Sequence, residues 1–281
     1  MSLSPALVSS LPAIQADLNY LIPMAEKPRN YTYEPPQGVA QSNARYAAHR
    51  LSIHDARPIA DALSLDEEGL VLVRHQSAVT DFYDEAQLRQ IYYPEAERLV
   101  AAATGASRVL VFDHTIRRRL QGTEDRTVGA PRQPVPRVHN DYTVKSGPQR
   151  VRDLLGAEAE TLLHGRFSVI NLWRPIRGPL RDAPLAVCDA SSVAFEDFVA
   201  ADLLYRDRTG ETYAVQHNPA HRWFYVPDMR PDEALLLKCY DSATDGRARF
   251  APHTAFEDPT ATGDILPRES IELRTLVFYP A

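Results

Sequence analysis

Cysteine is scarce in this chain: among 281 residues there are two, Cys188 and Cys239. Two cysteines cannot form a disulfide framework, and their spacing does not suit a zinc site. No apolar run reaches the ~20 residues that a membrane-spanning helix needs. The N-terminus lacks the basic start, apolar run and cleavage site of a secretory signal. These absences predict a cytoplasmic protein with no membrane attachment.

An excess of basic residues is also missing. The chain has 31 Lys and Arg against 37 Asp and Glu, a formal net charge of -6. A nucleic-acid-binding domain usually carries a basic stripe, so this class is set aside. The one basic cluster, residues 117–119, fits a solvated edge better than a receptor for an anionic substrate. Only 12 glycines stand against 22 prolines, which favours a loop-rich fold that contains strands.

Short apolar runs bounded by breakers predict at least seven strands, most of them in the second half of the chain. Helical spacing predicts helices over 84–103, with a new start at Pro94, over 146–155, and from Ser191 or Ser192 to 204. The strands are expected at 69–75, 107–116, 166–174, 185–189, 211–218, 222–226, 234–240 and 271–279, with a penultimate strand that opens at His253. This pattern predicts a mostly β fold with flanking helices, a double-sheet jelly roll (a cupin-like, double-stranded β-helix).

No linker divides the chain, which predicts one domain over 1–281. Residues 1–105 would form an N-terminal arm and helical support, and 106–281 the jelly-roll core. The first 60 residues look irregular, and the prolines at 35 and 36 exclude helix near the extended stretch 31–38. Such an arm is expected to lie on the surface or to wrap around the core. It could also form a contact between the two subunits of a homodimer.

One tripeptide organises the chemistry. His139 and Asp141 stand two positions apart and share a face if the segment is extended. With a second histidine, for which we select His253, they would give two imidazoles and one carboxylate, the set that binds non-haem Fe(II) and leaves positions open. On spacing alone, a hydrogen-bonded loop histidine beside a turn aspartate is an equal alternative. The loop 121–137 leads directly to His139, and its place suggests a lid over the metal.

A row of polar side chains near the C-terminus supports the metal site. Arg268, Ser270, Glu272 and Arg274 have the same parity, whereas Ile271, Leu273 and Val277 take the other face. Polar groups on one face of a core strand either line a cavity or satisfy one another. A guanidinium with a neighbouring hydroxyl suits a dicarboxylate ligand, because the planar guanidinium matches a carboxylate. The alternative is an ion pair, either Glu272–Arg274 or across strands, on a solvated face of the sheet.

With these residues in view, the chain resembles the Fe(II)/2-oxoglutarate-dependent oxygenases. More narrowly, it resembles the hydroxylase/desaturase family that includes the cephamycin 7-alpha-hydroxylase component and fungal gibberellin desaturase. The resemblance covers roughly residues 105–279. It depends on six segments in order, at 138–143, 171–175, 223–229, 238–242, 252–256 and 268–272.

The resemblance implies Fe(II) held by His139, Asp141 and His253, and 2-oxoglutarate chelated to it. The distal carboxylate of 2-oxoglutarate would bind Arg268 with Ser270, with Arg274 as the fallback. Asn171 and Arg174 would lie near the co-substrate or a substrate carboxylate. Dioxygen and a small secondary metabolite would be consumed, with hydroxylation or desaturation and release of succinate and CO2.

Two other classes stay open at this stage. A zinc hydrolase could use the same three residues, although the chain has no His-Glu-x-x-His segment to supply a general base. A non-catalytic jelly-roll binding protein would make the three positions incidental. The metal content of the purified protein separates these classes.

Overall fold

The computed structural model describes residues 3–125, 127 and 129–280, and its strands form two sheets. The five-stranded sheet has the order β4-β12-β7-β14-β5, so chain neighbours are separated by other strands, as in a jelly roll. Its central strands are buried on both faces. Its strands are β4 (Leu70–Arg74), β5 (Arg108–Arg118), β7 (Phe167–Pro175), β12 (Glu233–Asp241) and β14 (Glu269–Phe278).

The second sheet has nine strands in the order β1-β3-β11-β8-β13-β6-β10-β9-β2 and carries the short strands that bear the metal-site residues. The apolar side chains between the two sheets form the largest core cluster, which includes Phe167, Phe224 and Leu237. The nine strands are β1 (Ala13–Leu21), β2 (Arg29–Tyr31), β3 (Tyr46–Asp55), β6 (His139–Asn140), β8 (Leu185–Cys188), β9 (Phe198–Leu204), β10 (Thr209–Val215), β11 (Trp223–Tyr225) and β13 (His253–Ala255).

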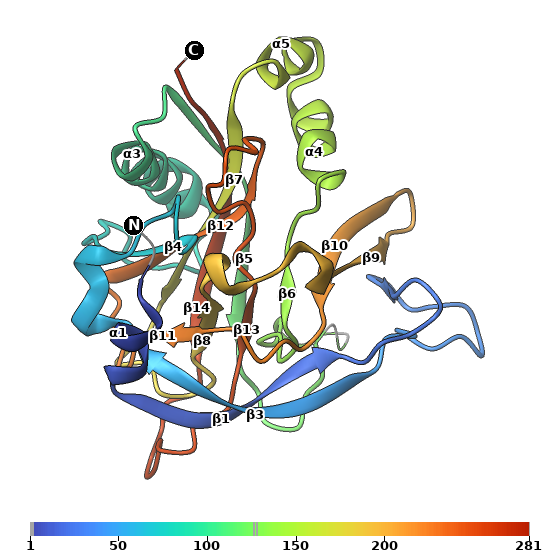
Figure 1. The fold of residues 1–281 in the computed structure, drawn as a ribbon. Coiled ribbons are helices and arrows are strands. Elements are labelled where there is room, and N and C mark those ends of the chain that lie inside the picture. The colour runs from blue at the N-terminus through green and yellow to red at the C-terminus, as the bar shows by residue number, and fades with distance from the viewer. Residues whose placement is uncertain (1–2, 126, 128, 281) are drawn as a thin grey trace.

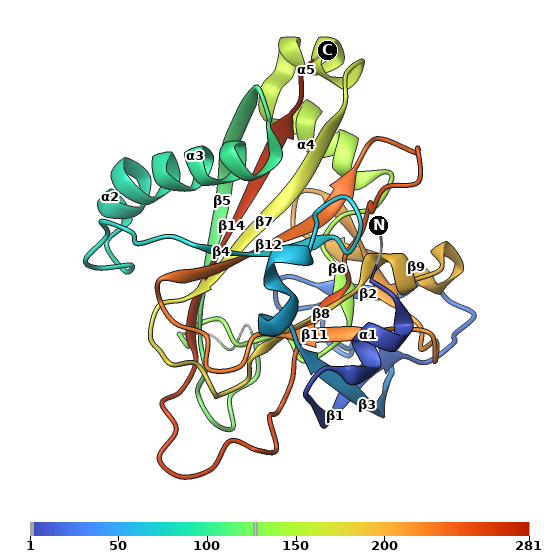
Figure 2. The same cartoon turned by 60° about the vertical axis from the view of Figure 1, so that its left-hand side comes forward.

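Helix α3 covers the outer face of the five-stranded sheet, away from the second sheet (Figure 2). Tyr92, the last residue of the π-helical turn Leu88–Tyr92 that leads into α3, and Ala96 and Val100 within α3 follow at four-residue intervals and pack on the outer residues of β7 and β14. Pro94 lies in the first turn of α3, as expected, and Gly105 ends it with a φ of 68°, a conformation that favours glycine. The helices are α1 (Pro5–Ser10), α2 (Glu85–Gln87), α3 (Tyr93–Thr104), α4 (Ser146–Leu155) and α5 (Ala159–Leu163).

The mostly β, jelly-roll prediction is confirmed, but two local predictions are wrong. The first 60 residues are not irregular: β1 and β3 form a long antiparallel pair along one edge of the nine-stranded sheet, at the base of Figure 1. Residues 198–204, predicted as helix, form strand β9, which pairs with β10. Short 3-10 turns at Ala190–Ser192 and Phe195–Asp197 take the place of the helix start.

The N-terminal third therefore contributes strands to both sheets, because β4 (Leu70–Arg74) pairs with β12 in the other one. This differs from the expected separation of an arm from a jelly-roll core near residue 105. Organisation as one domain stays a prediction. Within the described residues, the helices are all too short or too polar to cross a bilayer.

Candidate metal centre

The three predicted metal ligands meet between the two sheets. His139 on β6 and His253 on β13 are direct cross-strand partners, and their ring centroids lie 4.5 Å apart. Asp141 follows β6 immediately. One ligand atom from each of the three residues lies within 4.8 Å of the others, the only such group found among the described residues. The fold thus brings together residues more than a hundred positions apart in the sequence.

Backbone hydrogen bonds orient both imidazoles. Nδ1 of His139 lies 2.8 Å from the carbonyl of Arg137, and Nδ1 of His253 lies 3.0 Å from the carbonyl of Ala251. A carbonyl only accepts, so each Nδ1 donates and each Nε2 keeps its lone pair for a metal. Burial, and then the nearby His253, lowers the pKa of His139 to about 3. His139 therefore stays in the neutral form that metal ligation needs.

The Asp141 carboxylate is held through one oxygen. Its Oδ2 accepts hydrogen bonds from Asn171 Nδ2 at 2.8 Å and from Arg274 Nε at 3.2 Å. Its Oδ1 lies 3.6 Å from His139 Nε2, on the side of the histidines. Burial alone would raise the pKa of Asp141, but Arg274 and the two histidines hold it well below its ordinary value. One oxygen of an ionised carboxylate is thus available for a cation.

The polar row on β14 faces the interior as its parity predicts. Arg268 is buried; its Nε donates to Ser270 Oγ at 3.0 Å and its Nη1 donates to the Ala183 carbonyl at 2.7 Å. Its guanidinium lies 4.9 Å from the Trp173 ring centroid. Ala183 has a φ of 44°, an uncommon backbone conformation for a residue with a side chain, and its carbonyl fixes this arginine.

Arg274, the other candidate anchor, is already engaged. Besides Asp141, its guanidinium donates to Glu272 at 2.5 Å, to Thr115 at 3.0 Å and to Asp113 at 3.2 Å. Burial alone would lower the pKa of Arg274, but Glu272 and Asp141 hold it well above its ordinary value. Its donors serve the metal ligand and its neighbours.

Arg117 belongs to this interior, which the sequence interpretation missed. It is the cross-strand partner of Ser270, so it shares the inner face of the sheet with Arg268. Burial lowers the pKa of Arg117 to about 10, and burial together with the charge of Arg117 lowers the pKa of Arg268 to about 9. The prediction of a solvated edge is wrong for Arg117. Strand alternation could have found it, because Arg118 points to the other face and meets Glu269.

Arg174 does not join the site. It alternates with Asn171 and Trp173 along β7 and lies on the outer face of the sheet, where its guanidinium is 5.6 Å from the Tyr92 ring centroid and donates to the His75 carbonyl. The structure therefore does not bring Arg174 to the metal centre, although Arg174 was expected near the co-substrate or a substrate carboxylate. Its partner in that expectation, Asn171, lies beside Asp141.

A cavity of about 900 Å³ opens above the triad. His139, Asp141, Arg117 and Arg274 form part of its wall, and the remainder comes from β2, β3, β5, β9, β10, α4 and neighbouring loops. This volume suits a drug-sized molecule. The 121–137 segment borders the cavity through Asp125, Arg132, Val135 and Arg137. Its role as a lid stays a prediction.

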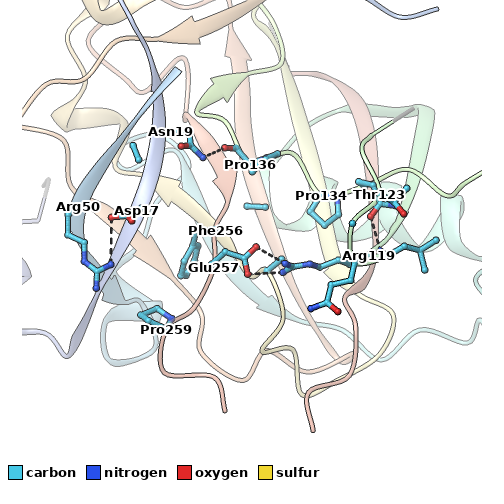
Figure 3. Close-up of a pocket in the computed structure, with 17 residues that line it drawn as sticks. Asp17, Asn19, Arg50, Arg119, Thr123, Pro134, Pro136, Phe256, Glu257 and Pro259 are labelled. Carbon is cyan, nitrogen blue, oxygen red and sulfur yellow. Dashed lines mark hydrogen bonds and ion pairs between the residues drawn. The ribbon is translucent and has the colours of Figure 1, made fainter. Parts of the chain in front are cut away.

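A second cavity of about 530 Å³ lies between the β1–β3 pair and the 119–123 segment (Figure 3). None of its lining residues also lines the larger cavity. Arg119 and Glu257 face each other in it, with an ion pair of 2.7 Å. This cavity is separate from the metal centre.

Comparisons with known proteins agree with the site. A family profile described as "Oxidoreductase/YMDC permease-like domain" matches residues 18–278. The hydroxylase/desaturase efuI of Hormonema carpetanum is 34% identical over 95% of this chain and 96% of its own length. The Fe(II)/2-oxoglutarate-dependent dioxygenase nvfI of Aspergillus novofumigatus is 32% identical, with 88% and 90% coverage. A solved structure of the iron and alpha-ketoglutarate-dependent endoperoxidase NvfI superposes with a TM-score of 0.85, covering 96% of this chain and 99% of that one at 28% identity.

The fold and the two-histidine, one-carboxylate site define a jelly-roll Fe(II)/2-oxoglutarate-dependent dioxygenase. Within that class, the chain belongs to the hydroxylase/desaturase family. The predicted enzyme class and the predicted cofactors, Fe(II) and 2-oxoglutarate, are confirmed. This assignment sets the zinc hydrolase and the non-catalytic binding protein aside.

Proposed function

We propose that His139 Nε2, His253 Nε2 and Asp141 Oδ1 are the atoms that bind Fe(II). The single observation that carries this proposal is the convergence of these three donors within 4.8 Å. The other nitrogen of each imidazole and the other oxygen of the carboxylate already have partners. Two neutral nitrogens and one anionic oxygen fit Fe(II) and leave positions for further ligands.

For 2-oxoglutarate, we propose Arg268 and Ser270 as the residues that bind the distal carboxylate. Arg268 has a donor left, because Nε and Nη1 are engaged and no hydrogen-bond partner of Nη2 is found among the described residues. Arg117 adds a second buried positive charge nearby. Two buried guanidiniums repel each other, and a carboxylate that binds between them offsets this repulsion. Arg274 is a weaker candidate, because its donors are engaged.

When bound, Fe(II) and 2-oxoglutarate supply the activation of dioxygen, with release of succinate and CO2. The chain contributes position and environment. Asn171 and Arg274 hold Asp141 in one orientation, and the backbone carbonyls of Arg137 and Ala251 hold the two histidines. The 121–137 segment borders the cavity and would restrict the entry of water.

The reaction we propose is hydroxylation or desaturation of a small secondary metabolite. The relatives are fungal proteins named hydroxylase/desaturase, and a cavity of about 900 Å³ accepts a molecule of that size. The solved relative is named an endoperoxidase, so the placement of the substrate decides between outcomes within this architecture. Cytoplasmic location, independence of nucleic acid and membranes, and pairing into a homodimer stay predictions that fractionation and size-exclusion chromatography test.

Equilibrium dialysis under anaerobic conditions tests the metal assignment. We expect one Fe(II) per chain, and loss of that binding in His139→Ala. The matched control is His164→Ala, at an exposed histidine outside the cavity, which should bind iron like the wild type. Equal iron binding by His139→Ala and the wild type would overturn the assignment. A strong preference for zinc over Fe(II) would also count against it.

A further inference from the structure

The wall of the larger cavity is more basic than the chain as a whole. It carries eight arginine or lysine side chains and six carboxylates, whereas the whole chain has 31 basic and 37 acidic residues. Loading with Fe(II) and the 2-oxoglutarate dianion adds no net formal charge. The loaded cavity therefore stays positive, and a cleft of one sign attracts ligands of the opposite sign.

Most of these cations already have a carboxylate partner. Arg132 donates to both oxygens of Asp125 at 2.8 and 2.9 Å, and Arg274 contacts Asp141 and Glu272. Arg137 differs. Its side chain lines the cavity and is partly buried, and over residues 3–125, 127 and 129–280 no ion pair or hydrogen bond of its guanidinium is found.

Arg137 lies next to the metal centre. It stands two residues before His139, and its carbonyl accepts the hydrogen bond that orients that ligand. Tyr46 lines the same cavity, and the charge of Arg137 opposes the burial that raises the pKa of Tyr46. His139 and Tyr46, which is on β3 (Tyr46–Asp55), thus line the cavity together with Arg137.

Arg150, on α4, is a second incompletely paired cation of the same cavity. Its Nε is buried and has no hydrogen-bond partner. Its guanidinium lies 5.7 Å from the Phe112 ring centroid, and the carboxylate of Asp153 is 3.9 Å away. An arginine between an aromatic ring and a cavity presents its remaining donors to a ligand.

We infer that the substrate carries a carboxylate and that Arg137 binds it, with Arg150 as a second cation of the pocket. The inference rests on the proposed function, because it concerns what this oxygenase oxidises. The planar guanidinium matches a carboxylate, and a partly buried cation without a counter-charge gains from one. An acid group fixed beside His139 would also determine which C–H bond of the substrate faces the metal.

The second cavity offers no comparable site. Its two arginines are neutralised, Arg119 by Glu257 at 2.7 Å and Arg50 by Asp17 at 3.6 Å (Figure 3). Arg50 is also largely exposed, which makes it a suitable control position.

The test compares 1-naphthaleneacetate with 1-naphthaleneacetamide, which share one apolar body and differ in charge. Each is titrated calorimetrically into anaerobic wild-type protein loaded with Fe(II) and 2-oxoglutarate, and the visible absorption of the loaded site is followed in parallel. We expect the acid to bind at least tenfold more tightly than the amide and to leave 2-oxoglutarate bound. Arg137→Gln should remove this preference while the amide binds as before, and Arg50→Gln should leave both affinities unchanged.

Equal affinity for acid and amide, no binding of the acid, or an unchanged preference in Arg137→Gln would overturn the inference. Displacement of 2-oxoglutarate by the acid would also overturn it, because the acid would then occupy the co-substrate site. The wild-type comparison of acid and amide needs no variant, so poor folding of Arg137→Gln leaves the test intact. Failure of the proposed function would be visible earlier, as no 2-oxoglutarate signal before any acid or amide is added.

Discussion

Arg274 Nε lies 3.2 Å from Asp141 Oδ2, so the guanidinium holds the carboxylate oxygen that faces away from the histidines. The directly opposite residue on β7, Asn171, donates to the same oxygen at 2.8 Å. Two donors on one oxygen leave the other for the metal and fix the rotation of the side chain. Arg274 is thereby a positioning residue for a metal ligand.

Replacing Arg274 with methionine should weaken iron binding. The substitution removes the charge that keeps Asp141 ionised and leaves Glu272 without its 2.5 Å partner. Loss of such an outer partner costs about 10- to 100-fold in metal affinity. Iron titration measures the effect, and 2-oxoglutarate affinity at saturating iron should change much less. The opposite split, with intact iron affinity and lost 2-oxoglutarate affinity, would make Arg274 the co-substrate anchor.

Arg268→Met should have the complementary effect. Removing one partner of a buried, hydrogen-bonded charge pair costs about 2–4 kcal/mol, so the Kd for 2-oxoglutarate should rise roughly 30- to 1000-fold. Iron binding should persist, because Arg268 makes no contact with the triad. Ser270→Ala removes one hydrogen bond of Arg268 and should weaken the binding free energy of 2-oxoglutarate by about 1 kcal/mol. Calorimetric titration of iron-loaded protein with 2-oxoglutarate gives both values.

Arg174→Met should leave 2-oxoglutarate affinity unchanged, in contrast with Arg268→Met. Arg174 lies on the far face of the sheet, and its buried Nε and Nη1 have no hydrogen-bond partners. A linear apolar side chain there leaves no buried donor unsatisfied but removes the hydrogen bond to the His75 carbonyl, so the free energy of unfolding should change by about 1 kcal/mol or less. A loss of co-substrate affinity in stable, iron-loaded protein would return Arg174 to the site.

Asp125→Asn should destabilise the protein in a pH-dependent way. Burial alone would raise the pKa of Asp125, but the two hydrogen bonds from Arg132 and its charge lower the pKa to about 2. A carboxyl whose folded pKa is below its unfolded value stabilises the fold above about pH 4, and this stabilisation is lost as the pH falls toward 2. Urea unfolding should give a difference of about 1–2 kcal/mol at pH 7. A difference that is the same at pH 7 and pH 3 would refute the assignment.

The sequence predicted the features that depend on short-range alternation. The parity of Arg268, Ser270, Glu272 and Arg274 placed them on one inner face, and β14 (Glu269–Phe278) bears this out through its pairing with β5 and β7. The same rule applied to β7 separates Asn171 from Arg174. The expectation for Arg174 came from the family resemblance and conflicted with that alternation.

The long-range features were harder to predict. Strand β1 alternates buried Ala16, Leu18 and Tyr20 with polar neighbours, a signal that could have identified it, although its partner β3 follows 25 residues later. The apolar spacing in 193–203 fits a helix, and tertiary pairing of β9 with β10 overrides it. The guanidinium nitrogens of Arg274 are all engaged and Arg117 is buried because strands distant in sequence contact each other. Patterns along the sequence alone do not contain these contacts.

Chelation of 2-oxoglutarate by iron at His139, Asp141 and His253 is tested most directly by an anaerobic titration of Fe(II)-loaded protein with 2-oxoglutarate, monitored through the weak visible charge-transfer absorption of the chelate. We expect a saturable band that is absent in His139→Ala, and that needs much higher 2-oxoglutarate concentrations in Arg268→Met but not in Arg174→Met. Fully iron-loaded wild-type protein that shows no band at any 2-oxoglutarate concentration would rule out chelation of 2-oxoglutarate at this site.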